Sequence, residues 1–365
     1  MRFLKKGIWT TLQDGGRPGH AAIGVTRSGA MDVFSQRALN ILLGHAGDHP
    51  VLEMHFPAPE IVFEEDCRFA LYGADFGPYL NDRPLLNGRI YPARPGDILK
   101  FKRKHSGQRC YLGIRWYVAA DSWLGSCSPD PAMKHPALPE RITPETANSE
   151  VPFPKGTNRK QEQVPSCTAN AEATFRKETD RKQELPPPCL TNTEALFREE
   201  TNRKQLYPLN TETPARGLMP PPIPDTLRFV PEFDFETLDE ASAEAIQTRP
   251  FTVTPESNRM GYRLRGKPLE RSVATEMVSS AVSRGTIQLL PDGQLVILMA
   301  DAQTTGGYPR LGYVCAADLS GLSRLGPGDT FSLKPVTEAE AVNSLLRQEE
   351  YLKILRKLLW TSTVI

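Results

Sequence analysis

The stretch GTIQLLPDGQLVILMAD, residues 285–301, decides the fold class of this chain. Two short apolar runs, TIQLL and LVILM, flank the tetrapeptide Pro-Asp-Gly-Gln. Turn residues between two apolar runs are typical of two antiparallel strands joined by a tight turn. Since each run is too short for an ordinary helix, the stretch predicts a β-hairpin.

Short apolar runs of the same kind recur on both sides of the chain. Residues 1–128 contain EIVFEED, CRFALYGADFG, DILKFKR and RCYLGIRWYV, and residues 226–335 contain RFVPEF, PFTVTP, GYRLRG and DTFSLKPV. Gly, Pro, Asn and Asp separate these runs, as they do in proteins built from many short strands. The chain lacks the alternation of strands and helices that builds a nucleotide-binding sheet. We therefore expect a mainly β fold of two units, of barrel or sandwich type, with few helices.

Two amphipathic stretches interrupt the β pattern. In DVFSQRALNILLGH the apolar residues share one helical face, with Asp32 as the N-cap and Gly44 as the stop. Residues 341–365 form a second helical stripe, made of Val342, Leu345, Leu346, Leu352, Leu355 and Leu359. We expect this stripe to pack on its own domain, with docking of a partner as the alternative.

A tandem repeat separates the two β units. Residues 146–161, 168–183 and 190–205 repeat at a spacing of 22 residues, which raises the possibility of a solenoid. Each copy offers a single large apolar residue, and prolines interrupt any long helix. We therefore expect a disordered insert over residues 129–225, with a partner-binding tether as the alternative. The predicted organisation is 1–128 and 226–340 as the two parts of one domain, the insert between them, and a helix over 341–365.

Composition excludes several classes of protein. The 365 residues carry 44 basic and 43 acidic side chains, so we expect neither nucleic acid nor a membrane surface as a partner. The N-terminus lacks the features of a signal peptide, and no stretch is long and apolar enough to span a bilayer. The six cysteines form no CxxC pair and the six histidines show no metal-ligand spacing. We expect reduced thiols, no metal and a cytoplasmic location.

Polar residues and glycines concentrate in three segments, at positions where no predicted strand or helix needs them. The first is TTLQDGGRPGHAAIGVTRSGAMD, residues 10–32, the second is ESNRMGYRLRG, residues 256–266, and the third is MADAQTTGGYPRLGYV, residues 299–314. Glycines permit close approach of the backbone, and arginines offer a planar fork for a carboxylate or phosphate. Polar side chains on glycine-rich loops are the usual place for binding groups, although each segment alone is also consistent with ordinary turns.

Sequence motifs of several common enzymes are missing. The chain has no GxxxxGK[ST] loop for nucleotide phosphates, no GxSxG nucleophile elbow and no HExxH metal motif. His20, inside the first segment, has the chemistry of an acid or base, but we expect it to be an ordinary exposed loop histidine.

The three segments, in this order, resemble the carboxyltransferase-type family that contains the C-type subunit of 5-oxoprolinase. The same family includes the allophanate hydrolase subunit 2 part of urea carboxylase and a bacterial antagonist of a histidine-kinase inhibitor. The stretch YLGIRWYVAADSWLGS, residues 111–126, is a weaker fourth match. The resemblance covers about 1–128 and 226–340, and it implies cyclophilin-like β-barrel units.

The resemblance also implies a function. Such a protein acts with a smaller homologous partner, the B-type subunit of 5-oxoprolinase, and with the A-type subunit, and the complex uses ATP to open 5-oxo-L-proline to L-glutamate. The first alternative is a non-catalytic regulator that binds a smaller homologous partner, like the kinase-inhibitor antagonist. The second is the carboxyltransferase component of a urea carboxylase-type system, the one case in which biotin is a cofactor.

The shared need of these reactions is a site that polarises the carbonyl of a small amide. The candidate base residues are Asp14, Asp32 and Asp301. The alternative for each of them is a purely structural role. The candidate substrate-binding residues are Gln13, Arg17, Ser28, Asn258, Arg259, Gln303, Thr304, Gly306, Gly307 and Tyr308. Among these, Arg17 or Arg259 would hold a carboxylate or developing charge, while the amide side chains would orient the substrate.

The sequence departs from the family pattern at three places, one of which is Pro231-Glu232, where relatives have Gly-Pro. Arg115-Trp116-Tyr117 stands where relatives have a Gly-Gly pair, and the Arg-Ser and glycine-rich segment usual after Ser126 is absent. If that segment lines the pocket, catalysis is weakened while the partner surface persists, which is the basis of the regulatory alternative.

Overall fold

The computed structural model describes residues 1–45, 47–116, 118, 120–130, 138, 140–143, 223–273 and 277–360, all within one compact unit of the chain. The predicted 22-residue repeats and nearly all of the predicted insert over 129–225 lie outside the described residues, as do residues 361–365. The predicted boundaries of the domain parts stay predictions.

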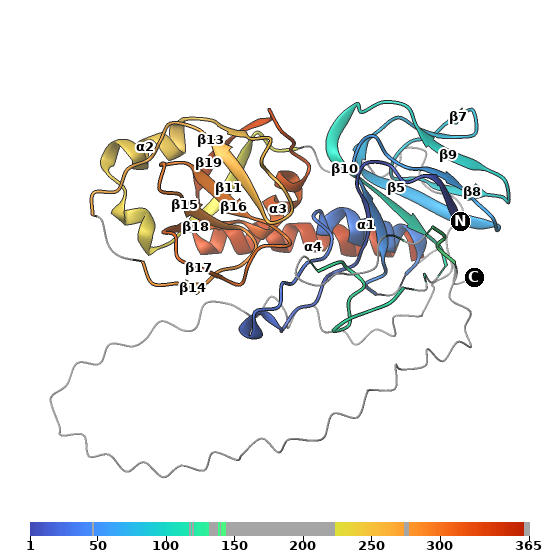
Figure 1. Ribbon diagram of the computed structural model, residues 1–365, viewed down its shortest axis with the longest axis horizontal. Helices are drawn as coiled ribbons and strands as arrows, with labels where there is room; N and C mark the ends of the chain where they lie inside the picture. Colours follow the sequence, from blue (N-terminus) through green and yellow to red (C-terminus); the bar gives the residue numbers. More distant parts are fainter. Residues whose placement is uncertain are drawn as a thin grey trace, which may run out of the picture. The chain divides into compact units, whose positions relative to one another are not determined.

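The N-terminal half consists of two five-stranded sheets whose strand pairs are all antiparallel within the described residues. One sheet contains, in spatial order, β1 (Arg2–Lys5), β4 (Glu60–Val62), β9 (Ile98–Phe101), β6 (Pro78–Leu80) and β7 (Arg83–Pro84). The other contains β2 (Thr10–Gln13), β3 (Val51–Met54), β10 (Ser106–Ile114), β5 (Cys67–Asp75) and β8 (Ile90–Ala93). Apolar residues of both sheets share one core, which includes the stacked rings of Phe63 and Phe69. Figure 1 shows this half in blue to green.

The C-terminal half is a closed seven-stranded barrel (Figure 1). Around the barrel the order is β11 (Thr226–Pro231), β18 (Arg310–Val314), β15 (Thr286–Leu289), β16 (Leu295–Leu298), β13 (Gly261–Arg265), β12 (Phe251–Val253) and β19 (Thr330–Pro335). A separate two-stranded ribbon pairs β14 (Ser280–Ala281) with β17 (Thr305–Gly306). The predicted hairpin is β15 and β16, which pair antiparallel. The expected mainly β fold with a barrel unit is therefore confirmed.

Helix α1 (Val33–Leu43) confirms the prediction made from its caps. The Asp32 side chain accepts a hydrogen bond from the Ser35 amide at 2.9 Å, as an N-cap residue does. At the other end Gly44 takes the left-handed conformation, with φ 75°, and donates to the Asn40 and Ile41 carbonyls. The helix is therefore fixed at both ends by the residues that the sequence singles out.

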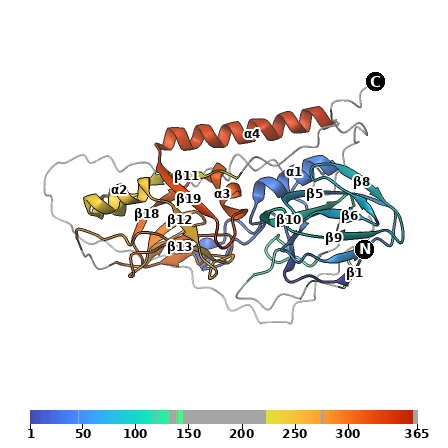
Figure 2. The ribbon, with the colours of Figure 1, turned by 90° about the horizontal axis from the view of Figure 1, so that it is seen from above.

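The remaining helical elements of the described residues are η1 (Ala21–Ile23), η3 (Phe233–Thr237), α2 (Glu240–Thr248), α3 (Ala316–Ser323) and α4 (Glu338–Trp360). Of these, η3, α2, α3 and α4 contact strands of the barrel, whereas η1 buries none of its residues. In Figure 2, α4 runs past α3 and α1. Its residues Leu352, Leu355 and Leu359 join the core that α1 forms with β3, β5 and β10. The helical stripe thus packs on its own domain in its second half.

The first half of that stripe behaves differently. Val342 and Leu346 are 44% and 50% exposed, so the apolar face of α4 is only partly covered by the described residues. Across the described part of the chain, no helix has the length and apolar character needed to cross a membrane.

Candidate functional site

Asp14, a candidate base, is the hub of the first polar segment. Its carboxylate accepts hydrogen bonds from the Gly16 amide at 2.8 Å, the Ser126 hydroxyl at 2.5 Å, the Cys127 amide at 2.8 Å and the Ser128 hydroxyl at 2.8 Å. The residue is 5% exposed. Because four donors surround a buried carboxylate, Asp14 ties the first segment to residues 126–128.

Arg17 lies at the same junction and is 1% exposed. Its guanidinium donates to the Ser128 carbonyl, forms a 3.4 Å ion pair with Asp130, and lies 5.1 Å from the centre of the Trp123 ring. The positive charge of Arg17 is therefore already balanced by a carboxylate of the chain itself. Its predicted role in holding a substrate carboxylate stays a prediction.

Two glycines let the first segment fold tightly upon itself. Gly16 has φ +80° and Gly29 has φ +91°. A Cβ atom on Gly16 would lie 2.5 Å from the Arg27 carbonyl oxygen, and one on Gly29 would lie 2.8 Å from the Gly16 amide nitrogen. Only glycine fits this crossing without displacing backbone. The crossing brings Ser28 beside residues 14–16, and Ser28 itself has φ 55°, which is rare for a residue with a side chain.

Arg259 joins all three polar segments. Its guanidinium donates to Asp301 at 2.7 and 2.9 Å, to the Gly29 carbonyl at 2.7 Å, and to Gln13 at 3.5 Å. A further bond of 2.7 Å runs to Glu53 on β3. Gln13 and Gly29 belong to the first segment, Arg259 to the second and Asp301 to the third. Residues of all three segments therefore meet around one 8% exposed side chain, while their role in binding a substrate stays a prediction.

Glu53 is the residue of this cluster that sequence reasoning missed. It is fully buried, and its carboxylate accepts from Arg259, from the Tyr111 hydroxyl at 2.8 Å and from the Met31 amide at 2.8 Å. Arg109 lies 3.6 Å away. Burial opposes ionisation, but the charges of Arg259 and Arg109 outweigh it and lower the pKa of Glu53 below its ordinary value.

The signal for Glu53 is present in the sequence. It stands within VLEMHF, an otherwise apolar run, and a charged residue inside a buried strand is almost never tolerated without a partner. Arg109, in the run QRCYLGI, carries the same signal. Its guanidinium donates to the Tyr262 hydroxyl and to the Ser323 carbonyl, so it also links the N-terminal half to the barrel.

Asp32 has a capping role and lies beside the same network. Its carboxylate accepts from the Ser35 amide and hydroxyl, at 2.9 and 2.6 Å, and lies 3.7 Å from Arg324. Its amide donates to the Tyr111 hydroxyl at 2.8 Å. The structural alternative stated for the aspartates therefore has direct support at Asp32, while a role as base stays a prediction.

The loops that carry the other candidates run side by side at one end of the barrel. The Asp301 amide donates to the Arg259 carbonyl at 2.9 Å, and the Met299 amide donates to the Met260 carbonyl at 3.0 Å. Candidate side chains on these loops that are exposed to solvent are those of Asn258, Gln303 and Tyr308. Thr304 is half-buried. Asn258 directly precedes the buried Arg259 in the chain, and Gln303 follows two residues after Asp301, the carboxylate that Arg259 binds.

Gly306 and Gly307 lie on the ribbon of β14 and β17. A Cβ atom on Gly306 would lie 2.6 Å from the amide nitrogen of Gln288, a buried residue of β15. The Gln288 nitrogen has no hydrogen-bond partner in the described residues. The glycine is therefore explained by close packing of the ribbon over β15, and a role in substrate binding stays a prediction.

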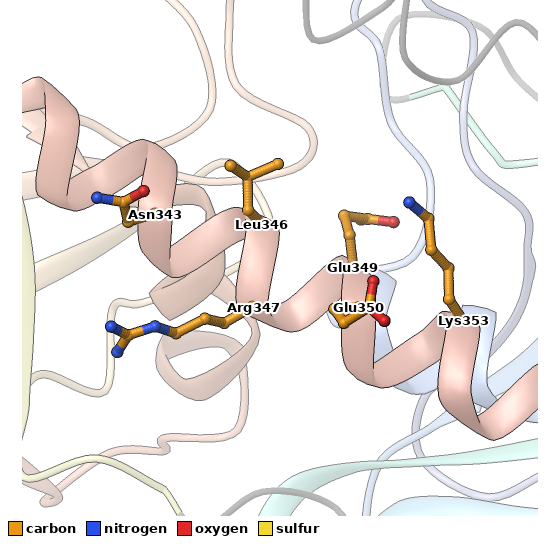
Figure 3. Close-up of a pocket in the computed structure, with 6 residues that line it drawn as sticks. All are labelled: Asn343, Leu346, Arg347, Glu349, Glu350 and Lys353. Atoms are coloured by element: carbon orange, nitrogen blue, oxygen red, sulfur yellow. The ribbon is translucent and has the colours of Figure 1, made fainter.

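A surface hollow of about 500 Å³ lies on α4. Figure 3 shows the side chains that line it, which are Asn343, Leu346, Arg347, Glu349, Glu350 and Lys353. None of them is a candidate from the three polar segments, and Glu349 is held by Arg37 of α1 at 2.8 Å. The hollow is a feature of the helix surface and contributes no residue to the Arg259 cluster.

Comparison with known proteins matches this architecture to a family. The family model for the carboxyltransferase domain, subdomain A and B, matches residues 23–335. The C subunit of the 5-oxoprolinase of Haemophilus influenzae is 30% identical over 353 residues, which are 95% of each chain. The corresponding C subunit of Escherichia coli is 27% identical over 351 residues, which are 96% of each chain.

A solved structure agrees at the level of the fold. The urea carboxylase of Kluyveromyces lactis superimposes with a TM-score of 0.71 at 24% identity, over 97% of this chain and 29% of that much longer one. The family model spans both the N-terminal sheets and the barrel, including part of the first polar segment and all of the other two. The chain therefore belongs to the carboxyltransferase domain family of subdomains A and B.

Proposed function

We propose that this protein is the C-type subunit of an ATP-dependent 5-oxoprolinase, which opens the lactam of 5-oxo-L-proline to L-glutamate together with A-like and B-like subunits. Two relatives that match over nearly their whole length are named as the C subunit of a 5-oxoprolinase. A name that specifies one subunit implies further subunits. ATP is used by the complex, and the present chain has no P-loop for it.

The observation that carries the proposal is the position of Arg259. It contacts Gln13 and Gly29 of the first polar segment and Asp301 of the third, and it directly follows the exposed Asn258. Preorganised donors in a site closed to water stabilise the charge that develops on an amide carbonyl during its opening. The network of Arg259 would hold the three loops in the geometry that such a site needs.

The exposed groups suit a small cyclic amide. Gln303 offers both a hydrogen-bond donor and an acceptor, and Asn258, whose oxygen accepts from the Met260 amide at 2.8 Å, offers its amide donors; these groups suit the C=O and N–H of a lactam. Asp301 is 9% exposed and paired with Arg259, so it would orient the guanidinium even where it does not itself accept a proton. These side chains would bind and orient the ring while ATP supplies the driving force.

The test is reconstitution with matched variants. The full chain is co-expressed with the A-like and B-like proteins, and release of glutamate from 5-oxo-L-proline is measured with and without ATP. We expect ATP-dependent glutamate release, and we expect Arg259→Lys to lower kcat/KM by about ten-fold or more because lysine cannot replace the planar fork. Arg263→Lys, an exposed change on β13, is the control and should leave activity intact.

A formed complex that releases no glutamate would overturn the proposal. The regulatory alternative is favoured by one observation, the internal pairing of both candidate substrate arginines, Arg17 with Asp130 and Arg259 with Asp301. It predicts tight binding of the smaller homologue that survives Arg259→Lys, with no turnover. Carboxylation that depends on biotin, supplied by a carrier protein in the assay, would instead support the carboxyltransferase alternative.

A further inference from the structure

Arg284 differs from the fully buried arginines of this protein. Arg17, Arg109, Arg259 and Arg324 are all at most 8% exposed, and each forms an ion pair with an aspartate or glutamate. Arg284, in the loop before β15, is half-buried and forms no ion pair with any carboxylate of the described residues. A buried guanidinium normally requires such a partner, so an uncompensated one calls for an explanation.

Backbone carbonyls are the acceptors that Arg284 contacts. One terminal nitrogen donates to the Ala30 carbonyl at 3.2 Å, and the other donates to the Met31 carbonyl. The Nε–H is buried and has no acceptor in the described residues. A guanidinium carries five N–H groups, and these two bonds leave three of them, including the buried Nε–H, without an acceptor in the described residues.

The surroundings of Arg284 are positive rather than neutralising. Burial and the charges of Arg27 and Arg259 lower the pKa of Arg284 to about 10, although Asp32 and Tyr111 act in the opposite direction. The guanidinium stays protonated at neutral pH. Arg27 is exposed beside it, so an anion arriving from solvent meets two positive charges at the same place.

A second unpartnered polar group belongs to the same loop. The Ser28 hydroxyl is buried and has no hydrogen-bond partner in the described residues. Ser28 stands two residues before Ala30, whose carbonyl accepts from Arg284, and it holds a left-handed backbone conformation with φ 55°. Strained backbone and an unsatisfied hydroxyl at one residue are a combination that proteins retain at binding sites.

We propose that Arg284 and Ser28 form an oxyanion subsite that binds the carboxylate of 5-oxo-L-proline. The assignment to this substrate rests on the proposed function, and the subsite itself rests on the unpaired guanidinium and hydroxyl. A carboxylate would take two N–H groups of Arg284 and the Ser28 O–H, which balances the buried charge. Arg17 and Arg259, already paired with carboxylates, would then serve to hold the loops.

The first test is ligand-induced stabilisation of the complete complex, or of the full chain if the partners do not assemble. Thermal unfolding is followed with 5-oxo-L-proline, with the uncharged lactam 2-pyrrolidinone and with inorganic phosphate. We expect 5-oxo-L-proline to raise the Tm of the wild type, and this rise to vanish in Arg284→Gln and to shrink in Ser28→Ala. The exposed control Arg263→Gln should keep the full rise.

The second test is steady-state kinetics of the assembled complex. Arg284→Lys and Arg284→Gln should raise KM for 5-oxo-L-proline by roughly ten-fold to a hundred-fold, with a smaller change in kcat, because charged hydrogen bonds of binding are lost. A merely structural Arg284 would lower the Tm without ligand and leave KM unchanged.

The outcomes separate the two proposals. An inactive wild-type complex in which 5-oxo-L-proline still raises the Tm through Arg284 overturns the proposed function and supports the subsite. A Tm rise by 5-oxo-L-proline that persists in Arg284→Gln overturns the subsite, as does its absence in the wild type. A rise produced by phosphate alone overturns the assignment to a carboxylate.

Discussion

Glu53 is the single residue on which the centre of the molecule depends most. Its carboxylate faces two guanidiniums, Arg259 at 2.7 Å and Arg109 at 3.6 Å, and it is fully buried. Transfer of these charges from water is costly, and their mutual attraction offsets the cost only while all partners are present. The carboxylate therefore stabilises the fold by balancing the charge of two largely buried cations, of which Arg259 is also paired with Asp301.

We expect Glu53→Gln to lower the free energy of unfolding by about 3–5 kcal/mol, because it leaves two buried guanidiniums without their shared counter-charge. Urea denaturation monitored by circular dichroism measures the change. The matched control is Glu60→Gln, whose ion pairs with Lys5 and Lys100 are partly exposed, and it should cost about 1 kcal/mol or less. Equal effects of the two variants would contradict this account of the buried network.

At this scale the sequence predicted the cluster in part. Gln13, Arg259 and Asp301 stand out because they are polar residues on glycine-rich loops, where no strand needs them. Glu53 and Arg109 were missed because they sit inside apolar strands, where the surrounding residues dominate the pattern. Arg284 was missed because a lone arginine before a strand is ordinarily solvated, and only the structure reveals that its charge lacks a carboxylate partner among the described residues.

The loop from residue 14 to residue 32 is the element that assembles the site. Its chain crosses itself where Gly16 meets Arg27 and Ser28, and where Gly29 meets Gly16. It then enters α1 through the cap at Asp32. The crossing places the Gly29 carbonyl on Arg259 and the Ala30 carbonyl on Arg284, so one loop orients both guanidiniums.

Gly16→Ala and Gly19→Ala separate steric conflict from backbone strain. Both glycines have positive φ, +80° and +87°, but a Cβ on Gly16 would lie 2.5 Å from a carbonyl oxygen while one on Gly19 has nothing within 4 Å. We expect Gly19→Ala to cost about 1 kcal/mol from strain alone, and Gly16→Ala to cost about 1–3 kcal/mol more. Thermal or urea unfolding measures both, and a Gly16→Ala protein no less stable than Gly19→Ala would refute the crossing.

The buried histidines between α1 and β3 should make stability depend on pH. The rings of His45 and His49 stack at 3.9 Å, and they bond to the Ile114 and Trp116 carbonyls. Burial lowers the pKa of His45 to about 4, and burial with the charge of His45 lowers the pKa of His49 to about 3.

In the unfolded chain these histidines have the ordinary pKa of about 6.5, so they become protonated below that pH. In the folded protein they stay neutral until the pH is considerably lower. We therefore expect the free energy of unfolding to fall by about 1.4 kcal/mol per pH unit for each histidine as the pH drops from about 6 towards 4. Urea midpoints across this range measure the slope, and His49→Gln should reduce it. The exposed His105→Gln is the control, and a slope that His49→Gln leaves unchanged would contradict the assignment.

The elements themselves were largely predictable. Hairpin β15–β16 and helix α1 formed where the sequence has a Pro-Asp-Gly turn and a pair of caps, since local chemistry specifies both. The predicted stripe of α4 was covered only in part, because Leu352, Leu355 and Leu359 meet α1 while Leu346 stays exposed. Periodicity shows that a helix has an apolar face and does not show how much of it a neighbour covers.

For the whole molecule, the main feature is that distant parts of the sequence share one buried polar junction. Arg259 joins the barrel to Glu53 of the N-terminal sheets. Arg109 of those sheets in turn bonds to Tyr262 and Ser323 of the C-terminal half. Met31, from the N-terminal half, packs in the core of the barrel. Pairings of this kind, between residues about 200 positions apart, cannot be read from local pattern. The resemblance to a known family grouped the three polar segments, but it named neither Glu53 nor Arg109.

In the function proposed above, the three polar segments act as one site for 5-oxo-L-proline. Amide hydrogen exchange of the assembled complex, with and without this ligand, measures it most directly. We predict that ligand slows exchange in residues 27–32, 258–261 and 301–308 with the same concentration dependence, and that Arg284→Gln shifts all three curves together to higher concentration. Protection confined to other residues, or exchange in these segments that the ligand leaves unchanged, would contradict the account.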